Sequence, residues 1–254
     1  MLRLSTTLPP NTPHRRVAPA PIRPPARRRP WPLDLYGSAI GKKYAMAVSG
    51  IVLMGYVLIH MVGNLKLYLG AESLNRYGEW LRVVGEPALP RETLLWGVRV
   101  VLLTAFLVHI HAAYQLTMLN RRARPTAYAT KRRWQASDYA SRTMRWSGVI
   151  VLLFVLFHLL DLTLGVANPG YVAGDVYRNT VASLQRWPVA IVYAAANLAL
   201  GLHLYHGAWS LFQSMGWNDR RVNRWRRNFA LAFTALVVVG NVSFPLAVLT
   251  GAVS

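Results

Sequence analysis

Residues 44–69 read YAMAVSGIVLMGYVLIHMVGNLKLYL, a stretch whose only charged side chain is that of Lys66. An α-helix needs about 20 consecutive apolar residues to cross the hydrocarbon core of a bilayer, so this stretch is long enough to span a membrane. Four further stretches of this kind follow, at approximately 94–119, 146–166, 187–213 and 228–250. The sequence therefore predicts an all-α integral membrane protein with five transmembrane helices, the first four of which form a bundle.

The basic residues are concentrated in alternate segments between these stretches. The 254 residues include 29 Lys and Arg against 9 Asp and Glu, a net charge of +20, although 54% of the chain is hydrophobic. Residues 1–43, 120–145 and 214–227 carry nine, eight and five Lys or Arg, whereas residues 70–93 and 167–186 carry three and two. Because basic segments stay in the cytoplasm, we expect a multi-pass protein of the cell inner or plasma membrane, with its N-terminus cytoplasmic and its C-terminus outside. Nucleic-acid binding is the alternative explanation for so many arginines, and the alternation argues against it.

The N-terminal segment has a different composition from the rest. Residues 1–32 contain nine of the 15 prolines, together with several arginines. Such a segment cannot bury enough apolar surface to fold alone, and it lacks the apolar core of a signal peptide. We therefore expect a Pro/Arg-rich cytoplasmic arm over residues 1–36 and a transmembrane domain over residues 37–254.

Six of the seven histidines lie in the first four apolar stretches, where ionisable side chains are rare and are functional candidates by default. At 1.5 Å per residue, His60 and His158 lie about 24 and 18 Å from the cytoplasmic ends of their helices. The corresponding depths are about 12 Å for His111 and 15 Å for His203. Two layers of two imidazoles each are the ligand set of two b-type haems, and bundle cores are where such sites are built.

Other interpretations of these histidines remain open at this point. His109 and His111 are about 200° apart on a helix, so only one of them can face the core. His203 and His206 share a face, so one of them can bind a metal while the other contacts a propionate or a quinone. Zinc usually takes three or four N, S or O ligands, and the chain has no cysteine, which disfavours zinc. A single buried histidine can also simply bond a backbone carbonyl.

Several segments are together similar to one known family. They are GKK at 41–43, SGIVLMGYVLIHMVGNLKLYLGAESLNRYGEWLR at 49–82, HAAYQL at 111–116, RWSGVIVLLFVLFHLLD at 145–161 and HLYHGAWSLFQSMGWN at 203–218. They resemble the cytochrome b membrane-anchor subunit of bacterial succinate dehydrogenase and fumarate reductase, of the single-chain, five-helix, di-haem type. The resemblance covers nearly all of the chain from about residue 37.

The resemblance implies four haem-iron ligands, which by motif are His60, His111, His158 and His203. It implies that His111 pairs with His203 near the cytoplasm and that His60 pairs with His158 near the outside. It also implies two haems b and a quinone, for which we take menaquinone, although these residues do not distinguish it from ubiquinone. The implied partners are a flavoprotein that oxidises succinate and an iron–sulfur subunit, so this chain would act in an enzyme without holding its succinate site. Membrane lipid is a further partner, and a higher oligomer is left open.

Other polar residues are candidates for contacts with the cofactors. Arg pairs with carboxylates such as haem propionates through its planar fork. The candidates for propionate or quinone contacts are Lys43, Arg99, Arg145, Ser147 and His206. Asp161, three residues after His158, is a candidate for proton transfer, for orienting a ligand or for pairing with Arg99.

Three alternative functions stay in view. The chain can be an anchor that holds partners and quinone with little or no haem. It can supply two histidines to an iron–sulfur cluster of Rieske type, whose thiolates would then come from a partner. A transporter that relays protons through its histidines is the third, although the sequence has no inverted repeat of the transporter type.

Overall fold

The computed structural model describes residues 30–123, 139–217 and 219–254, and every regular element in these ranges is a helix. Five helices are long and apolar enough to cross a membrane, and they coincide with the five predicted stretches. They are α2 (Ala39–Asn64) with its continuation η1 (Leu65–Leu69), α4 (Thr93–Arg122), α5 (Tyr139–His158) with its continuation η2 (Leu159–Thr163), α7 (Trp187–Ser214) and α8 (Arg220–Leu249). The all-α class and the five predicted transmembrane helices are therefore confirmed.

Three shorter helices lie at the ends of the long ones. They are α1 (Trp31–Gly37), α3 (Ala71–Val83) and α6 (Val176–Leu184). Helix α1 covers the last six residues of the predicted arm and Gly37, and most of that arm, residues 1–29, lies outside the described residues. Pro32 lies in the first turn of α1, where its fixed backbone angle matches the helix. Its missing N–H costs no hydrogen bond there, because the first helical N–H groups have no partner within the helix.

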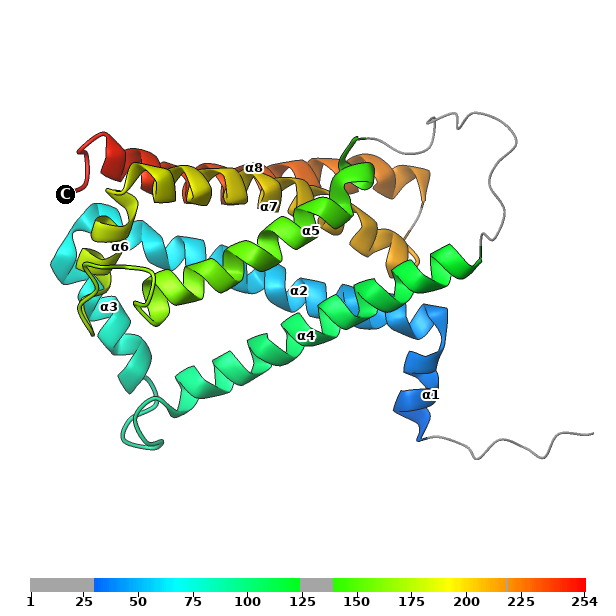
Figure 1. Ribbon diagram of the computed structural model, residues 1–254. Coiled ribbons are helices and arrows are strands. Elements are labelled where there is room, and N and C mark those ends of the chain that lie inside the picture. Colours follow the sequence, from blue (N-terminus) through cyan, green and yellow to red (C-terminus); the bar gives the residue numbers. More distant parts are fainter. Residues whose placement is uncertain (1–29, 124–138, 218) are drawn as a thin grey trace, which may run out of the picture.

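The long helices pack in two groups (Figure 1). Helices α7 and α8 lie side by side along their length, and α5 packs on α7. Helix α2 packs on α4 and also contacts α7 and α8, so it connects the two groups. Helix α4 diverges from α2 towards the end of the molecule where α3 lies (Figure 1).

Small residues allow the helices of the α7–α8–α2 contact to approach closely. A Cβ atom at Gly201 of α7 would stand 2.6 Å from a methyl carbon of Val238 on α8. A Cβ atom at Gly240 of α8 would stand 2.5 Å from the sulfur of Met61 on α2. Membrane helices associate through such close packing because the lipid tails are as apolar as the side chains.

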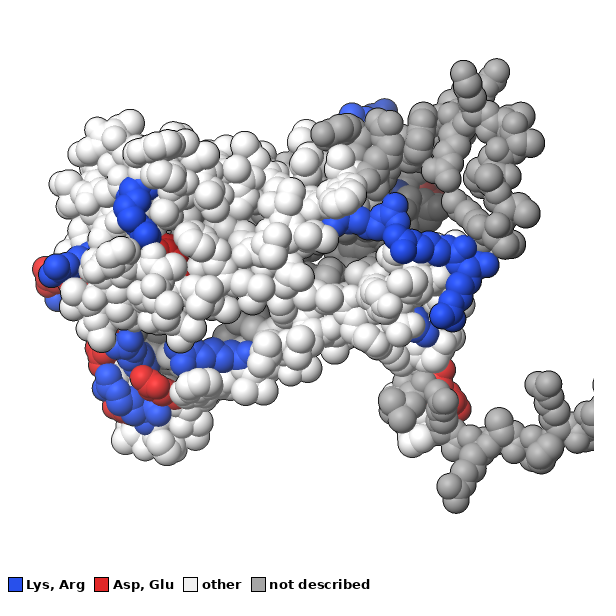
Figure 2. All heavy atoms as spheres, in the orientation of Figure 1, with Lys and Arg blue, Asp and Glu red and all other residues white. Residues whose placement is uncertain are grey.

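The charges lie at the two ends of the molecule, and the belt between them is mostly uncharged (Figure 2). The end that carries α1 and the C-terminus of α4 is basic and includes Lys42, Lys43, Arg121 and Arg122. The end that carries α3 and α6 has both basic and acidic side chains (Figure 2). Large apolar side chains of the belt are exposed, Val239 by 69% and Leu153 by 61%, as expected for side chains that face lipid.

Candidate cofactor site

One pair of histidines joins α2 to α5. The rings of His60 and His158 have centroids 5.9 Å apart and planes 85° apart. Tyr56, one turn before His60, stacks on that ring with a centroid distance of 5.3 Å. Phe154, one turn before His158, lies against the other ring with a centroid distance of 5.8 Å. Aromatic side chains of the same helices therefore flank both imidazoles of this outer pair.

A second pair joins α4 to α7. The rings of His109 and His203 have centroids 6.2 Å apart and planes 65° apart. Nδ1 of His109 lies 3.2 Å from the carbonyl oxygen of Met46 and 3.3 Å from the hydroxyl of Ser49, both on α2. Because a carbonyl oxygen only accepts, the contact with Met46 requires the proton on Nδ1 and leaves Nε2 unprotonated, the form that binds a metal. We refer to His109 and His203 as the inner pair.

The resemblance implied that His111 pairs with His203, but the structure places His111 away from His203. His111 is exposed, and its Nδ1 lies 2.6 Å from the hydroxyl of Tyr36 on α1. Its Nε2 lies 3.4 Å from the side-chain nitrogen of Gln115. Because residues two apart on a helix point in nearly opposite directions, turning His109 towards α7 turns His111 away from it.

The spacing within each pair fits one metal ion held between two imidazoles. A bond from an imidazole nitrogen to a metal is about 2.0 Å, so two imidazoles on opposite sides of one ion have ring centroids about 6 Å apart. The observed distances are 5.9 and 6.2 Å. In the part of the chain that the structure describes, no group of three or more His, Asp or Glu side chains could hold a metal ion. The donor set at each place is therefore two histidines on two helices.

Two glycines lie directly against the imidazoles of the inner pair. A Cβ atom at Gly50 of α2 would stand 3.5 Å from His109, and one at Gly148 of α5 would stand 3.3 Å from His203. The buried Nδ1 of His203 makes no hydrogen bond within the described residues. The glycines therefore let α2 and α5 lie directly against the imidazoles of this pair.

The two pairs lie at different levels along the helices. Gly148 adjoins His203 of the inner pair, and His158 of the outer pair is ten residues further along α5. Ten residues of helix span about 15 Å. The outer pair lies towards the α3 and α6 end of the molecule, and the inner pair lies towards the basic end.

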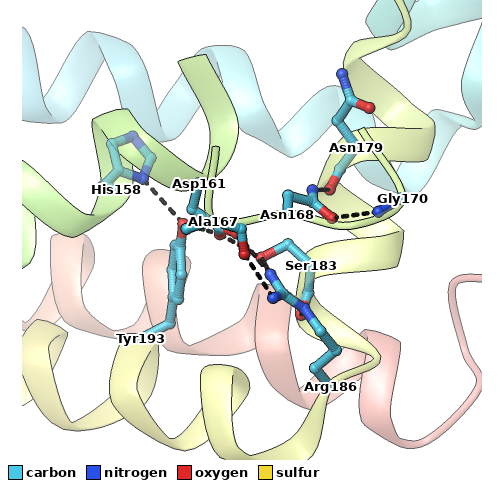
Figure 3. A network of polar contacts seen from close by, with 9 residues as sticks. All are labelled: His158, Asp161, Ala167, Asn168, Gly170, Asn179, Ser183, Arg186 and Tyr193. Atoms are coloured by element: carbon cyan, nitrogen blue, oxygen red, sulfur yellow. Dashed lines mark hydrogen bonds and ion pairs between the residues drawn. The ribbon is translucent and has the colours of Figure 1, made fainter. Parts of the chain in front are cut away.

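Asp161 is the centre of a polar network next to His158 of the outer pair (Figure 3). Its side chain is fully buried, in the π-helical turn η2 that follows His158. One carboxylate oxygen accepts from Arg186 at 2.6 Å, and the other accepts from Ser183 and, at 2.8 Å, from the hydroxyl of Tyr193. The same hydroxyl lies 3.3 Å from Nδ1 of His158 (Figure 3).

Asp161 therefore pairs with Arg186, and the alternative that it pairs with Arg99 is wrong. Arg186 also donates to the carbonyl oxygen of Ala167 at 2.8 Å, which fixes the guanidinium against the loop after η2. Arg99 is exposed on α4, and its guanidinium lies over the ring of Trp96, 4.6 Å from the centroid.

The remaining candidate residues lie near the inner pair or at the basic end. Ser147, the residue before Gly148, is buried and donates to the carbonyl oxygen of Met144 at 2.9 Å. Lys43 and Arg145 are exposed, on α2 and α5. His206 is half-buried, one turn after His203 on α7. The contacts that we expect these side chains to make with a cofactor stay predictions.

A pocket of about 420 Å³ lies on the side of α4 that carries His111. Its lining residues are Tyr36, Ala45, Leu107, Val108 and His111. The pocket is open and mostly apolar, with the Tyr36–His111 hydrogen bond as its polar feature.

Comparison with known proteins gives one family. Residues 118–241 match the model of the succinate dehydrogenase/fumarate reductase transmembrane subunit. The matched range runs from the end of α4 into α8 and includes Asp161 and one histidine of each pair, His158 and His203. No curated protein and no solved structure matches the chain.

Proposed function

The chain belongs to the family of succinate dehydrogenase/fumarate reductase transmembrane subunits, and from this premise we propose that it carries electrons between an iron–sulfur subunit and membrane quinone through two haems b. It is a multi-pass membrane protein and the membrane subunit of an oxidoreductase complex. The proposal adds the cofactors, the ligands and the direction of the electron path to that assignment.

The observation that supports this proposal is the presence of two histidine pairs at the spacing of a shared metal ion. The outer haem would be held by His60 and His158, and the inner haem by His109 and His203. This replaces the ligand set implied by motif, because His111 lies away from His203. Haem iron held by these histidine pairs would supply one-electron redox chemistry.

The protein's own residues orient the ligands and exclude water. The carbonyl oxygen of Met46 fixes the tautomer of His109. Tyr56 and Phe154 flank the outer imidazoles, so that apolar surface surrounds that pair. The surrounding dielectric and the hydrogen bonds to the ligands set the potential of such a group. We assign Lys43, Arg145 and Ser147 to the propionates of the inner haem, because they lie at the same end of the bundle.

The orientation and the partners complete the proposal. The basic end faces the cytoplasm, where the iron–sulfur subunit and the flavoprotein bind, and succinate is oxidised in the flavoprotein. The mixed-charge end with α3 and α6 faces outside. The quinone, for which we take menaquinone, would be the redox partner of the haems, and the membrane is the cell inner membrane.

The test is the haem content of the purified complex, measured by the pyridine haemochrome assay on wild type and on two matched variants. Wild type should contain two haems b per copy of this chain. His109→Ala should contain one, because the inner pair loses a ligand, whereas His111→Ala, two residues along the same helix, should keep two.

Other results would contradict the proposal in distinct ways. Two haems in His109→Ala with one in His111→Ala would show that the motif assignment is right and the structural pairing is not. A wild-type complex without haem would overturn the electron path and leave only the anchor, in which case an EPR signal would identify an iron–sulfur cluster.

A further inference from the structure

The hydrogen bonds around Tyr193 fix where the protons lie. The Tyr193 hydroxyl has one proton, and it donates that proton to Asp161 at 2.8 Å. The oxygen of Tyr193 can then only accept from His158, whose Nδ1 is 3.3 Å away. Nδ1 of His158 therefore carries a proton, and its Nε2 is the unprotonated nitrogen.

The network is anchored on both sides of this hydroxyl. Asp161 is 0% exposed and accepts from three donors, of which Arg186 is an ion-pair partner. The ring of Tyr193 lies against Phe154 with a centroid distance of 5.0 Å. Neither end of the Asp161–Tyr193 hydrogen bond can therefore turn freely.

The backbone places the carboxylate by an unusual turn. Residues 159–163 form a π-helical turn directly after His158, and such turns are rare and often occur at functional sites. Asp161 projects from this turn towards Ser183 and Tyr193 on the segments that follow (Figure 3). A regular α-helix through these residues would give the carboxylate a different direction.

The inner pair has no equivalent of this arrangement among the described residues. His109 is held by a backbone carbonyl oxygen, and His203 has no hydrogen bond at Nδ1. The outer pair alone is linked, through one hydroxyl, to a buried carboxylate.

We propose that Asp161 and Tyr193 are positioning residues, which hold the ring and the tautomer of His158 so that Nε2 faces His60 and the haem between them. The inference rests on the proposed function. An acceptor on the far nitrogen of a metal-binding histidine fixes its orientation and raises its basicity, and loss of such a partner typically costs 10–100-fold in metal affinity or activity. A more basic ligand favours ferric iron, so the network lowers the midpoint potential of the outer haem.

The experiment is a redox titration of both haems in the purified complex, with the EPR spectrum of each ferric haem. Tyr193→Phe keeps the aromatic ring and removes the acceptor, and we expect the outer haem to rise in potential while the inner haem stays unchanged. A tenfold loss of preference for ferric iron corresponds to about 59 mV for a one-electron couple. The EPR signal of the outer haem should also change, because the ring of His158 is free to turn.

Two further variants separate positioning from packing. Tyr68→Phe also loses a tyrosine hydrogen bond, the one of 2.7 Å to Ser243 near the same end, and should leave both potentials unchanged. Asp161→Asn retains the Tyr193 hydroxyl without its charged acceptor, and should shift the outer haem in the same direction by less. Loss of the outer haem alone from an assembled Tyr193→Phe complex would also support positioning.

Assembled Tyr193→Phe and Asp161→Asn complexes with two haems, unchanged potentials and an unchanged EPR spectrum would overturn this inference alone. A wild-type complex without haem would overturn the proposed function and this inference together. The two failures are therefore distinguishable in the same set of preparations.

Discussion

Gly148 on α5 leaves space for the imidazole of His203, a member of the inner pair. A Cβ atom there would stand 3.3 Å from Cε1 of His203, so a branched side chain must displace the imidazole. We expect wild type to contain two haems and assembled Gly148→Val to contain one. The pyridine haemochrome assay measures this. Gly97→Val on α4 is the matched control, because nothing lies within 4 Å of a Cβ atom at that position. Full haem content in Gly148→Val would contradict the assignment of the inner site.

The choice between His109 and His111 shows what the sequence could have revealed at this scale. Depth along the helix could not separate them, because two residues of helix differ by about 3 Å. The face of the helix could have done so. Ala105 and Ala112 are the buried residues of α4, and with His109 they have the i, i+4, i+7 spacing of one helix face. Small residues on one side of an otherwise bulky helix therefore indicated the packed side.

The partners of Asp161 lay beyond sequence reasoning. Ser183, Arg186 and Tyr193 are 22 to 32 residues away along the chain and belong to other segments. Nothing in the sequence distinguishes Arg186 from other residues of a predicted outside segment, or Tyr193 from the other aromatic residues of the apolar stretches. Only the tertiary contact brings them to the carboxylate.

The short helices α3 and α6 are held together by one clamp of hydrogen bonds. Asp175, at the N-cap of α6, accepts from the backbone N–H of Arg178 at 3.0 Å and from the Asn75 amide on α3 at 2.9 Å. Asn75 in turn accepts from the backbone N–H of Tyr177 at 2.9 Å. Loss of an N-cap side chain costs about 1 kcal/mol, so we expect Asp175→Ala to lower the unfolding temperature of the complex, measured by thermal denaturation in detergent.

The same carboxylate predicts a dependence on pH. The hydrogen bonds from Arg178 and Asn75 lower the pKa of Asp175 below its ordinary value of 3.8. A lowered pKa stabilises the fold at a pH above that ordinary value, and this stabilisation is lost as the pH falls through the lower pKa of the folded state. Asp175→Asn keeps a capping oxygen without the charge. Its unfolding temperature should be below that of wild type at pH 7, and the difference should shrink in acid. A difference independent of pH would contradict this.

The elements differ in how far the sequence predicts them. Each long helix follows from an apolar run that has no other stable form in a membrane, because every backbone polar group must be satisfied within the segment. Their predicted positions were correct to within a few residues, except that α2, α5 and α8 each begin five to eight residues earlier. Helices α1, α3 and α6 and the π-turn are short, and hydrogen bonds such as those of Asp175 stabilise them. A pattern of apolar residues has no means of encoding such contacts.

The two ends of the molecule differ in charge: basic residues gather at one end, and both basic and acidic residues occur at the other (Figure 2). A haem near each end would then face a different electrostatic environment, because fixed positive charges favour the electron-rich form of a nearby group. The inner pair lies towards the basic end, and the outer pair has the ion pair of Asp161 and Arg186 close to it. The arrangement of charge would therefore bear on both the insertion into the membrane and the proposed electron path.

The orientation in the membrane can be tested cleanly because the chain has no cysteine, so that a single introduced thiol is the only one it carries. Ala123 and Ala173 are exposed residues at opposite ends of the molecule. The positive-inside rule predicts that a membrane-impermeant maleimide labels Ala173→Cys in intact cells and labels Ala123→Cys only after the membrane is opened. Labelling in detergent and denaturant controls for thiols that the partner subunits cover. Labelling of Ala123→Cys in intact cells, with Ala173→Cys protected, would reverse the topology and place the inner pair at the outer surface, which would contradict the proposed path of electrons from cytoplasmic subunits.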